Sequence, residues 1–142
     1  MKGLLLDTNV LSELRKGVRA DPHVRAWLAK VDDSSLFSSV LVVGEIRRGI
    51  ETLRRRDAVS ARALDRWLAR LETAYADRLL PIDRAVAEEW GRLDAAFGLP
   101  AVDGLLVATA RVHELVLVTR NTKDVLRTGI ELLNPFHASR GS

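Results

Sequence analysis

Short apolar runs alternate along this chain with longer segments in which apolar residues recur every three or four positions. The runs are too short for helices and lack the polar alternation of a half-exposed sheet, so they predict buried strands. We expect these strands at residues 3–6, 35–38, 79–82, 115–118 and 131–133. The helical spacing predicts helices over residues 10–14, 22–31, 40–53, 59–75, 86–97 and 103–112. Strands that alternate with helices predict an α/β fold, with a central, mainly parallel sheet of four to five short strands flanked by helices.

The size of the chain is that of one domain, because it has 142 residues and 47% of them are apolar. We expect a single domain over residues 1–136 and a flexible tail over residues 137–142. The chain has no cysteine, which excludes disulfides, thiolate zinc sites and cysteine nucleophiles. Its longest apolar runs have four residues, against about 18 for a membrane span, and an acid interrupts the N-terminal leucines where a signal peptide would continue. These features predict a soluble, cytoplasmic protein without a membrane partner.

The charge of the chain is mildly basic, with 22 Lys and Arg against 19 Asp and Glu. Basic residues cluster at positions 47–48 and 54–56, while the acids are scattered. Such clusters are equally typical of a solvated helix face and of a surface that contacts RNA. Aromatic residues make up only 5% of the chain, which disfavours a base-stacking platform for single strands.

Acidic residues follow two of the predicted strands. Asp7 comes directly after the first strand, and Asp124 lies in the loop after residues 115–118. Ligands of a parallel sheet bind outside the carboxyl ends of its strands, so these two acids are candidates for one site. Asp103 is predicted in the first turn of the helix that leads into residues 115–118, and the strand rule does not fix its face.

One further acid, Glu45, lies on the apolar side of its predicted helix. A helical projection at about 100° per residue places it between Leu41 and Val42. A buried carboxylate without a partner costs several kcal/mol, so we expect something to compensate Glu45.

Each of these acids also has an ordinary structural explanation. Asp7 can serve only as a helix N-cap, and Asp103 can simply complement the dipole at the start of its helix. Asp124 can form an Asx-turn, and Glu45 can pair with Arg48 one turn along the helix. The histidines show no metal-ligand spacing and are predicted to lie at the surface: His23, His113 and His137.

Several carboxylates that converge on one sheet edge repel each other unless a cation neutralises them. Ligands that are all oxygen favour Mg²⁺ or Mn²⁺ over zinc. A cation held by carboxylates can bind phosphate oxygens, activate water and stabilise a leaving alkoxide. The chain has no Gly-rich phosphate loop and no Ser-His-Asp set, so metal-assisted hydrolysis of phosphodiesters is the chemistry that the sequence favours.

The acidic segments resemble those of PIN-domain nucleases, and they occur in the order of that family. Residues 5–14 (Leu-Leu-Asp-Thr-Asn-Val-Leu-Ser-Glu-Leu) resemble the family's opening, and residues 45–50 resemble the segment with its central glutamate. Residues 100–110 are similar to the third acidic motif and residues 118–124 to the fourth, while 128–129 and 134–136 resemble the closing strand. The resemblance covers residues 3–136 and is greatest to VapC-type toxins of bacterial toxin–antitoxin pairs.

The resemblance implies a function, a site and partners. It implies an Mg²⁺-dependent ribonuclease, with Mn²⁺ as a substitute, that acts on RNA as a homodimer. It also implies inhibition by a cognate antitoxin that carries a DNA-binding domain. The implied Mg²⁺-binding and catalytic acids are Asp7, Glu45, Asp103 and Asp124, with Asp103 facing the same pocket as Asp7. The implied supporting polar residues are Thr8, Asn9, Thr119 and Asn121.

Three other functions remain open on the sequence alone. A PIN-like module for RNA binding or assembly would keep the fold and the basic surface without tight metal binding. A haloacid-dehalogenase-type phosphatase also has an Asp after its first strand, but it requires a second Asp where this chain has Asn9. A receiver domain requires an acidic pair near the end of the first strand and an Asp at mid-sheet, and neither is evident. We expect the metal-dependent nuclease.

Overall fold

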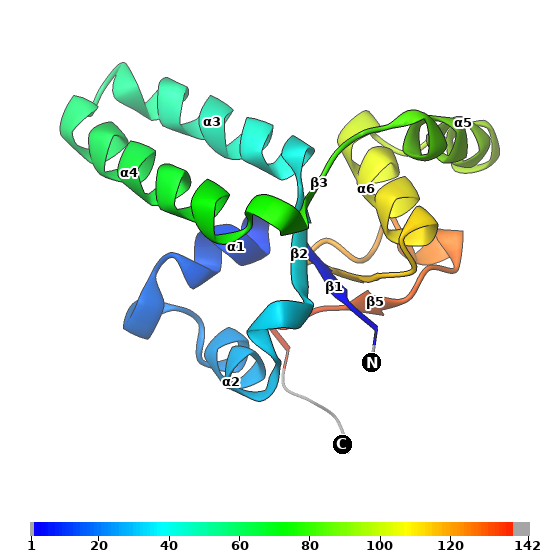
Figure 1. Ribbon diagram of the computed structural model, residues 1–142, viewed down its shortest axis with the longest axis horizontal. Helices are drawn as coiled ribbons and strands as arrows, with labels where there is room; N and C mark the ends of the chain where they lie inside the picture. Colours follow the sequence, from blue (N-terminus) through cyan, green and yellow to red (C-terminus); the bar gives the residue numbers. More distant parts are fainter. Residues whose placement is uncertain (1, 138–142) are drawn as a thin grey trace.

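The centre of the molecule is a five-stranded, fully parallel sheet with the strand order β3-β2-β1-β4-β5 (Figure 1). The computed structural model describes residues 2–137. The strands are β1 (Leu4–Leu6), β2 (Leu36–Ser39), β3 (Leu79–Leu80), β4 (Val116–Val118) and β5 (Leu132–Leu133). The predicted α/β class with a central parallel sheet is therefore confirmed.

Six helices cover the two faces of this sheet. They are α1 (Thr8–Leu14), α2 (Pro22–Lys30), α3 (Val40–Arg54), α4 (Ala58–Ala74), α5 (Arg84–Phe97) and α6 (Ala101–Val112). The chain moves outward from β1 to β2 and β3 and then crosses back to β4, so right-handed connections put α1–α4 on one face and α5–α6 on the other. Figure 1 shows this division, with α3 and α4 side by side as a hairpin that projects beyond the sheet.

The core is built around β1, which lies between β2 and β4. Leu5 is fully buried and pairs in register with Phe37 on β2 and Leu117 on β4. Because helices cover both faces of the sheet, its strands are apolar on both sides, which explains why the sequence runs lack polar alternation.

Local signals fix where the helices begin and end. Side chains cap five of them at the N-terminus: Asp7 on α1, Asp21 on α2, Ser39 on α3, Asp57 on α4 and Asp83 on α5. Helix α5 ends at Gly98, whose φ of 62° lies in the left-handed region that glycine adopts without a steric penalty. The helix therefore ends at Phe97, as the helical spacing of residues 86–97 predicts.

The observed bounds differ from the predicted ones by at most two residues, and two of the differences occur at prolines. Strand β3 has only two residues instead of four, because it is an edge strand and Pro81 has no N–H to extend the ladder. Helix α6 begins at Ala101 rather than 103, directly after Pro100. The predicted tail lies outside the described residues apart from His137, and the domain range 1–136 stays a prediction. In residues 2–137, no helix has both the length and the apolar character that a membrane span requires.

Candidate active site

The side chain of Asp7 is buried and held by two hydrogen bonds at the carboxyl end of β1. Its Oδ1 accepts the backbone N–H of Thr8 at 2.7 Å, and its Oδ2 accepts the hydroxyl of Thr119 at 2.7 Å. Its backbone N–H donates to the carbonyl of Val118 at 3.0 Å, so Asp7 continues the pairing of β1 with β4. Asp7 is the N-cap of α1, as the structural explanation predicts, but the Thr119 contact goes beyond capping.

The environment of Asp7 disfavours its charged form. Burial raises the pKa of this carboxyl above its ordinary value, and the nearby Glu45 charge raises it further. The two hydrogen bonds act in the opposite direction and do not offset the burial. A carboxylate in this position is stabilised by any cation that approaches it.

Glu45 lies on α3 and is joined to the start of α1 by a hydrogen bond. Its Oε1 accepts the hydroxyl of Thr8 at 2.6 Å. Its other oxygen lies 3.8 Å from the Arg48 guanidinium, a long contact to a side chain that is 77% exposed. An exposed pair of this kind contributes little, so Thr8 is the stronger of the two partners. Through its backbone and its hydroxyl, Thr8 contacts both Asp7 and Glu45.

Asp103 lies in the first turn of α6, where its charge is favourable for the helix dipole. Burial raises its pKa, and the charges of Asp7, Asp124 and Glu45, in that order, raise it further. The three other acids therefore lie close enough to act on Asp103. The structure thus brings all four predicted acids to one edge of the sheet, although they come from four separate segments.

Asp124 is the least fixed of the four acids. Its side chain is exposed, in the turn that precedes a short 3₁₀ helix at Leu126–Thr128. Within the described residues it accepts no hydrogen bond, so the structure does not support the Asx-turn explanation.

The predicted supporting residues brace the loop after β4 against α1. The backbone N–H of Asn121 donates to the Thr119 hydroxyl oxygen at 3.1 Å. The side-chain oxygen of Asn9 accepts the backbone N–H of Arg120 at 3.1 Å. These contacts hold the Thr119 hydroxyl where it donates to Asp7.

The donor set of this edge fits a hard cation. Its candidate ligands are all carboxylates, with neither histidine nor thiol among them, and neighbouring acids raise the pKa values of Asp7 and Asp103. Among residues 2–137, no three acidic or histidine side chains form a ready-made ion site as they stand. The hydroxyls of Thr8 and Thr119 donate to oxygens of Glu45 and Asp7 that would otherwise be free to bind a cation. The three histidines are exposed, as predicted.

Sequence reasoning missed two serines that support the site. Ser38 and Ser39 end β2 and are fully buried. The Ser38 hydroxyl donates to the carbonyl of Leu6 at 2.8 Å, next to Asp7, and Ser39 caps the helix that carries Glu45. Two consecutive serines at the end of a predicted strand are the signal that marks this position.

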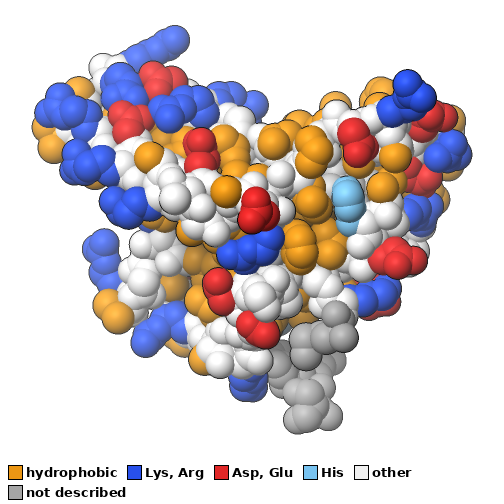
Figure 2. All heavy atoms as spheres, viewed as in Figure 1, with side chains coloured by type: hydrophobic (Ala, Val, Ile, Leu, Met, Phe, Trp, Pro, Cys, Tyr) orange, Lys and Arg blue, Asp and Glu red, His pale blue; other side chains and the backbone are white. Residues whose placement is uncertain are grey.

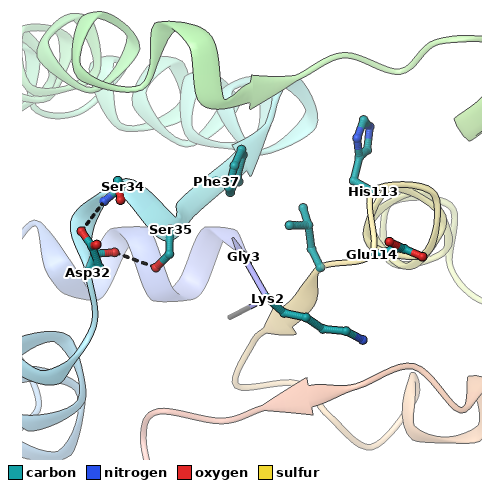
Figure 3. A pocket seen from close by; sticks show the side chains of 9 residues that line it. Lys2, Gly3, Asp32, Ser34, Ser35, Phe37, His113 and Glu114 are labelled. Atoms are coloured by element: carbon teal, nitrogen blue, oxygen red, sulfur yellow. Dashed lines mark hydrogen bonds between the residues drawn. The ribbon is translucent and has the colours of Figure 1, made fainter.

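A cavity of about 380 Å³ opens beside Glu45. Helices α1, α3 and α4 line it, with Ile46, Ile50 and Trp67 among the apolar side chains. A larger cavity of about 780 Å³ lies at the amino ends of the strands, away from the acids (Figure 3). Figure 3 shows Phe37 and His113 on its walls and the hydrogen bonds of Asp32 with Ser34 and Ser35 at one side.

Comparisons with known proteins agree on one family. The family described as the PIN domain matches residues 4–129. Toxin FitB of Neisseria gonorrhoeae is 31% identical over 94% of this chain and 99% of its own length. VapC ribonuclease Y4jK of Sinorhizobium fredii is 30% identical over 94% of this chain and 97% of its own. The solved structure of FitAB bound to a DNA fragment superimposes with a TM-score of 0.84 at 26% identity, covering 98% of this chain and 99% of that one.

Proposed function

The chain belongs to the PIN-domain family, in the group that includes the FitB and VapC toxins, and from that premise we propose that it is a metal-dependent endoribonuclease and the toxin of a toxin–antitoxin pair. The observation that carries the proposal is that negative charges gather at the carboxyl edge of the sheet: Glu45 acts on Asp7, and Asp7, Asp124 and Glu45 act on Asp103. The full-length similarity to a VapC ribonuclease supports RNA as the substrate.

We assign the binding of Mg²⁺, with Mn²⁺ as a substitute, to these four carboxylates. When bound, the ion supplies charge for a phosphate oxygen and lowers the pKa of water, which is the chemistry that hydrolysis of a phosphodiester requires. Thr119 and Thr8 orient Asp7 and Glu45, and Asn9 and Asn121 hold the loop that carries Thr119. Burial keeps bulk water from solvating Asp7, so its charge acts strongly on whatever cation is present.

The proposed regulator is a cognate antitoxin with a DNA-binding domain, which the DNA-bound FitAB relative supports. We expect a C-terminal segment of this antitoxin to lie in the cavity beside Glu45, which apolar residues of α3 and α4 line. An arginine of that segment would meet Asp7 and Asp103, because its planar fork binds carboxylates in a bidentate way. We also propose that the active form is a homodimer.

The test of this function is RNA cleavage by the purified protein with and without metal. We expect cleavage with Mg²⁺ or Mn²⁺, and none in excess chelator until metal is added back. Alanine at the antitoxin's inserted arginine should restore cleavage in the complex, with a smaller effect on binding. Cleavage that continues in chelator, with no response to metal, would exclude the mechanism. Tight RNA binding without cleavage under all metal conditions would favour the non-catalytic RNA-binding module.

A further inference from the structure

The whole positive excess of the chain lies in one element, the α3–α4 hairpin. This hairpin, residues 40–74, is called the arm below. It contains eight arginines and five acids, whereas the rest of the chain contains fourteen basic and fourteen acidic residues. Figure 2 shows the corresponding gathering of basic side chains over the arm. The body of the protein is thus neutral overall, and the arm is cationic.

Seven of the eight arginines of the arm fall into two groups, and the eighth, Arg48, makes the long contact with Glu45. Arg47 and Arg54 bind acids of the arm itself: Arg47 contacts Asp65 at 2.7 Å and Glu51 at 3.0 Å, and Arg54 contacts the same two acids at 2.8 and 2.9 Å. These contacts tie α4 to α3 and neutralise both guanidiniums. The other group is exposed and makes no ion pair within residues 2–137: Arg55, Arg56, Arg62, Arg66 and Arg70.

The unpaired group has a regular arrangement on α4. Arg62, Arg66 and Arg70 recur every four residues, on the side opposite the face that buries Leu68 and Leu71. At about 1.5 Å per residue, this row extends for about 12 Å along the helix. A row of guanidiniums at successive turns presents hydrogen-bond donors to an extended chain of anionic groups.

The arm begins beside the acids, because it carries Glu45. Glu45 lies near the start of α3, and the hairpin turn lies about ten residues further, which corresponds to about 15 Å of helix. The cavity beside Glu45 runs along this length, because Arg56 and Trp67 line it as well. A strand whose phosphodiester lies at the acids can therefore reach Arg56 at the hairpin turn, and the row on the outer side of α4 begins six residues further along the chain, at Arg62.

We propose that the arm is an RNA-binding element, in which Arg55, Arg56, Arg62, Arg66 and Arg70 bind phosphates of the substrate at a distance from the scissile bond. The inference rests on the proposed ribonuclease function and adds a binding surface to it. Arginine suits phosphate because its planar fork binds it in a bidentate way. Between the arginines the outer face of α4 carries the small residues Ala63 and Ala69, without the apolar centre that a protein interface requires.

The test is RNA binding by the full-length protein in the Asp7→Asn background, so that the RNA stays intact. Fluorescence anisotropy with a labelled single-stranded RNA of about 20 nucleotides compares two triple variants. The arm variant is Arg62→Gln/Arg66→Gln/Arg70→Gln, and the control variant, with the same loss of charge on the body, is Arg19→Gln/Arg84→Gln/Arg92→Gln. We expect the arm variant to weaken binding at least about tenfold and to lower the slope of log Kd against log salt by about two.

Further measurements keep the result specific. Lysine at the same three arm positions should retain most of the affinity, because the charge remains. In the chain with Asp7 intact, the arm variant should lose more cleavage on an RNA of about 20 nucleotides than on an RNA of a few nucleotides, which is too short to reach the arm. Equal weakening by the arm and control variants, or no weakening by either, would overturn the proposal. Unchanged RNA binding with weaker antitoxin binding would overturn it too and assign the arm to an acidic protein partner. Loss of affinity in the arm variant of a chain that never cleaves RNA would support the arm while refuting the ribonuclease function.

Discussion

At the amino ends of the strands the surface encloses a cavity of about 780 Å³, whereas the cavity beside Glu45 at the other end measures about 380 Å³. Two charged groups of the larger cavity have partners nearby: Lys2 pairs with Glu131 at 2.6 Å, and Asp32 accepts the N–H of Ser34 at 3.1 Å. At the carboxyl ends, burial and the charges of neighbouring acids raise the pKa values of Asp7 and Asp103 instead. Charge that is gathered and left uncompensated marks a candidate site better than volume does.

The sharpest test of this contrast removes one carboxylate at each end. Asp7→Asn keeps the size and the capping ability of the side chain but removes its charge, so cleavage should fall at least about a hundredfold, roughly 2.7 kcal/mol of barrier. Asp32→Asn at the amino end should leave cleavage unchanged, because asparagine also caps. Initial rates with saturating Mg²⁺ and melting temperatures measure both effects. A fall of about ten degrees or more in the melting temperature of Asp7→Asn would instead favour a purely structural role.

A smaller effect distinguishes the two partners of Glu45. Glu45→Gln should slow cleavage at least about tenfold, about 1.4 kcal/mol, and weaken Mg²⁺ binding measured by calorimetry. Arg48→Ala should leave the metal affinity unchanged, because the 3.8 Å contact is exposed. Equal and negligible effects of the two changes would remove Glu45 from the site and leave three aspartates.

The pH dependence of stability should also reveal the acids at the carboxyl ends of the strands. The pKa values of Asp7 and Asp103 are raised, so the folded state holds these protons more tightly than the unfolded state does. Their contribution to stability is therefore greatest below the ordinary value of 3.8 and is lost as pH rises through the raised values. Without metal, Asp7→Asn should melt a few degrees higher than the unmodified protein at pH 7, and the gap should close near pH 3. A gap that does not vary with pH would contradict this.

The smallest effect concerns the wall of the larger cavity. A Cβ at Gly3 would lie 2.7 Å from Leu115 Cδ2 and 2.9 Å from the Phe37 ring. Gly3→Ala should therefore cost about 1 kcal/mol of folding free energy, because these side chains must shift. Urea unfolding measures the cost, and cleavage by the folded fraction should be unchanged. A loss of specific activity would link the amino end to the chemistry after all.

The parts of the site that the sequence predicts are those that local rules determine. Asp7 follows a strand, and the strand rule places it at the carboxyl edge. The contact of Thr8 with Glu45 joins residues 37 positions apart, so no local pattern indicates it. The position of Asp103 depends on the packing of α6 on the face of the sheet opposite α3, which periodicity does not specify.

One buried acid escaped the sequence analysis entirely. Glu13 is only 8% exposed and accepts the backbone N–H of Asp21 at 2.8 Å and the ammonium of Lys16 at 3.0 Å. The Asp21 contact is the main cause that lowers the pKa of Glu13, and the Lys16 contact lowers it further. The hydrogen bond from Asp21 to Glu13 holds α1 against the start of α2. The sequence does not indicate this role, because an acid in the last turn of a short helix is usually exposed.

The hydrogen bond between Asp7 and Thr119 joins residues 112 positions apart, and this separation sets an order of events during synthesis. The first strand leaves the ribosome long before its neighbour β4 exists, so a growing chain has Asp7 but not the loop that orients it. At a synthesis rate of about 5–20 residues per second, the interval between the two segments is on the order of ten seconds. An enzyme arranged in this way stays idle while it is being made, and its partner needs to capture only finished molecules.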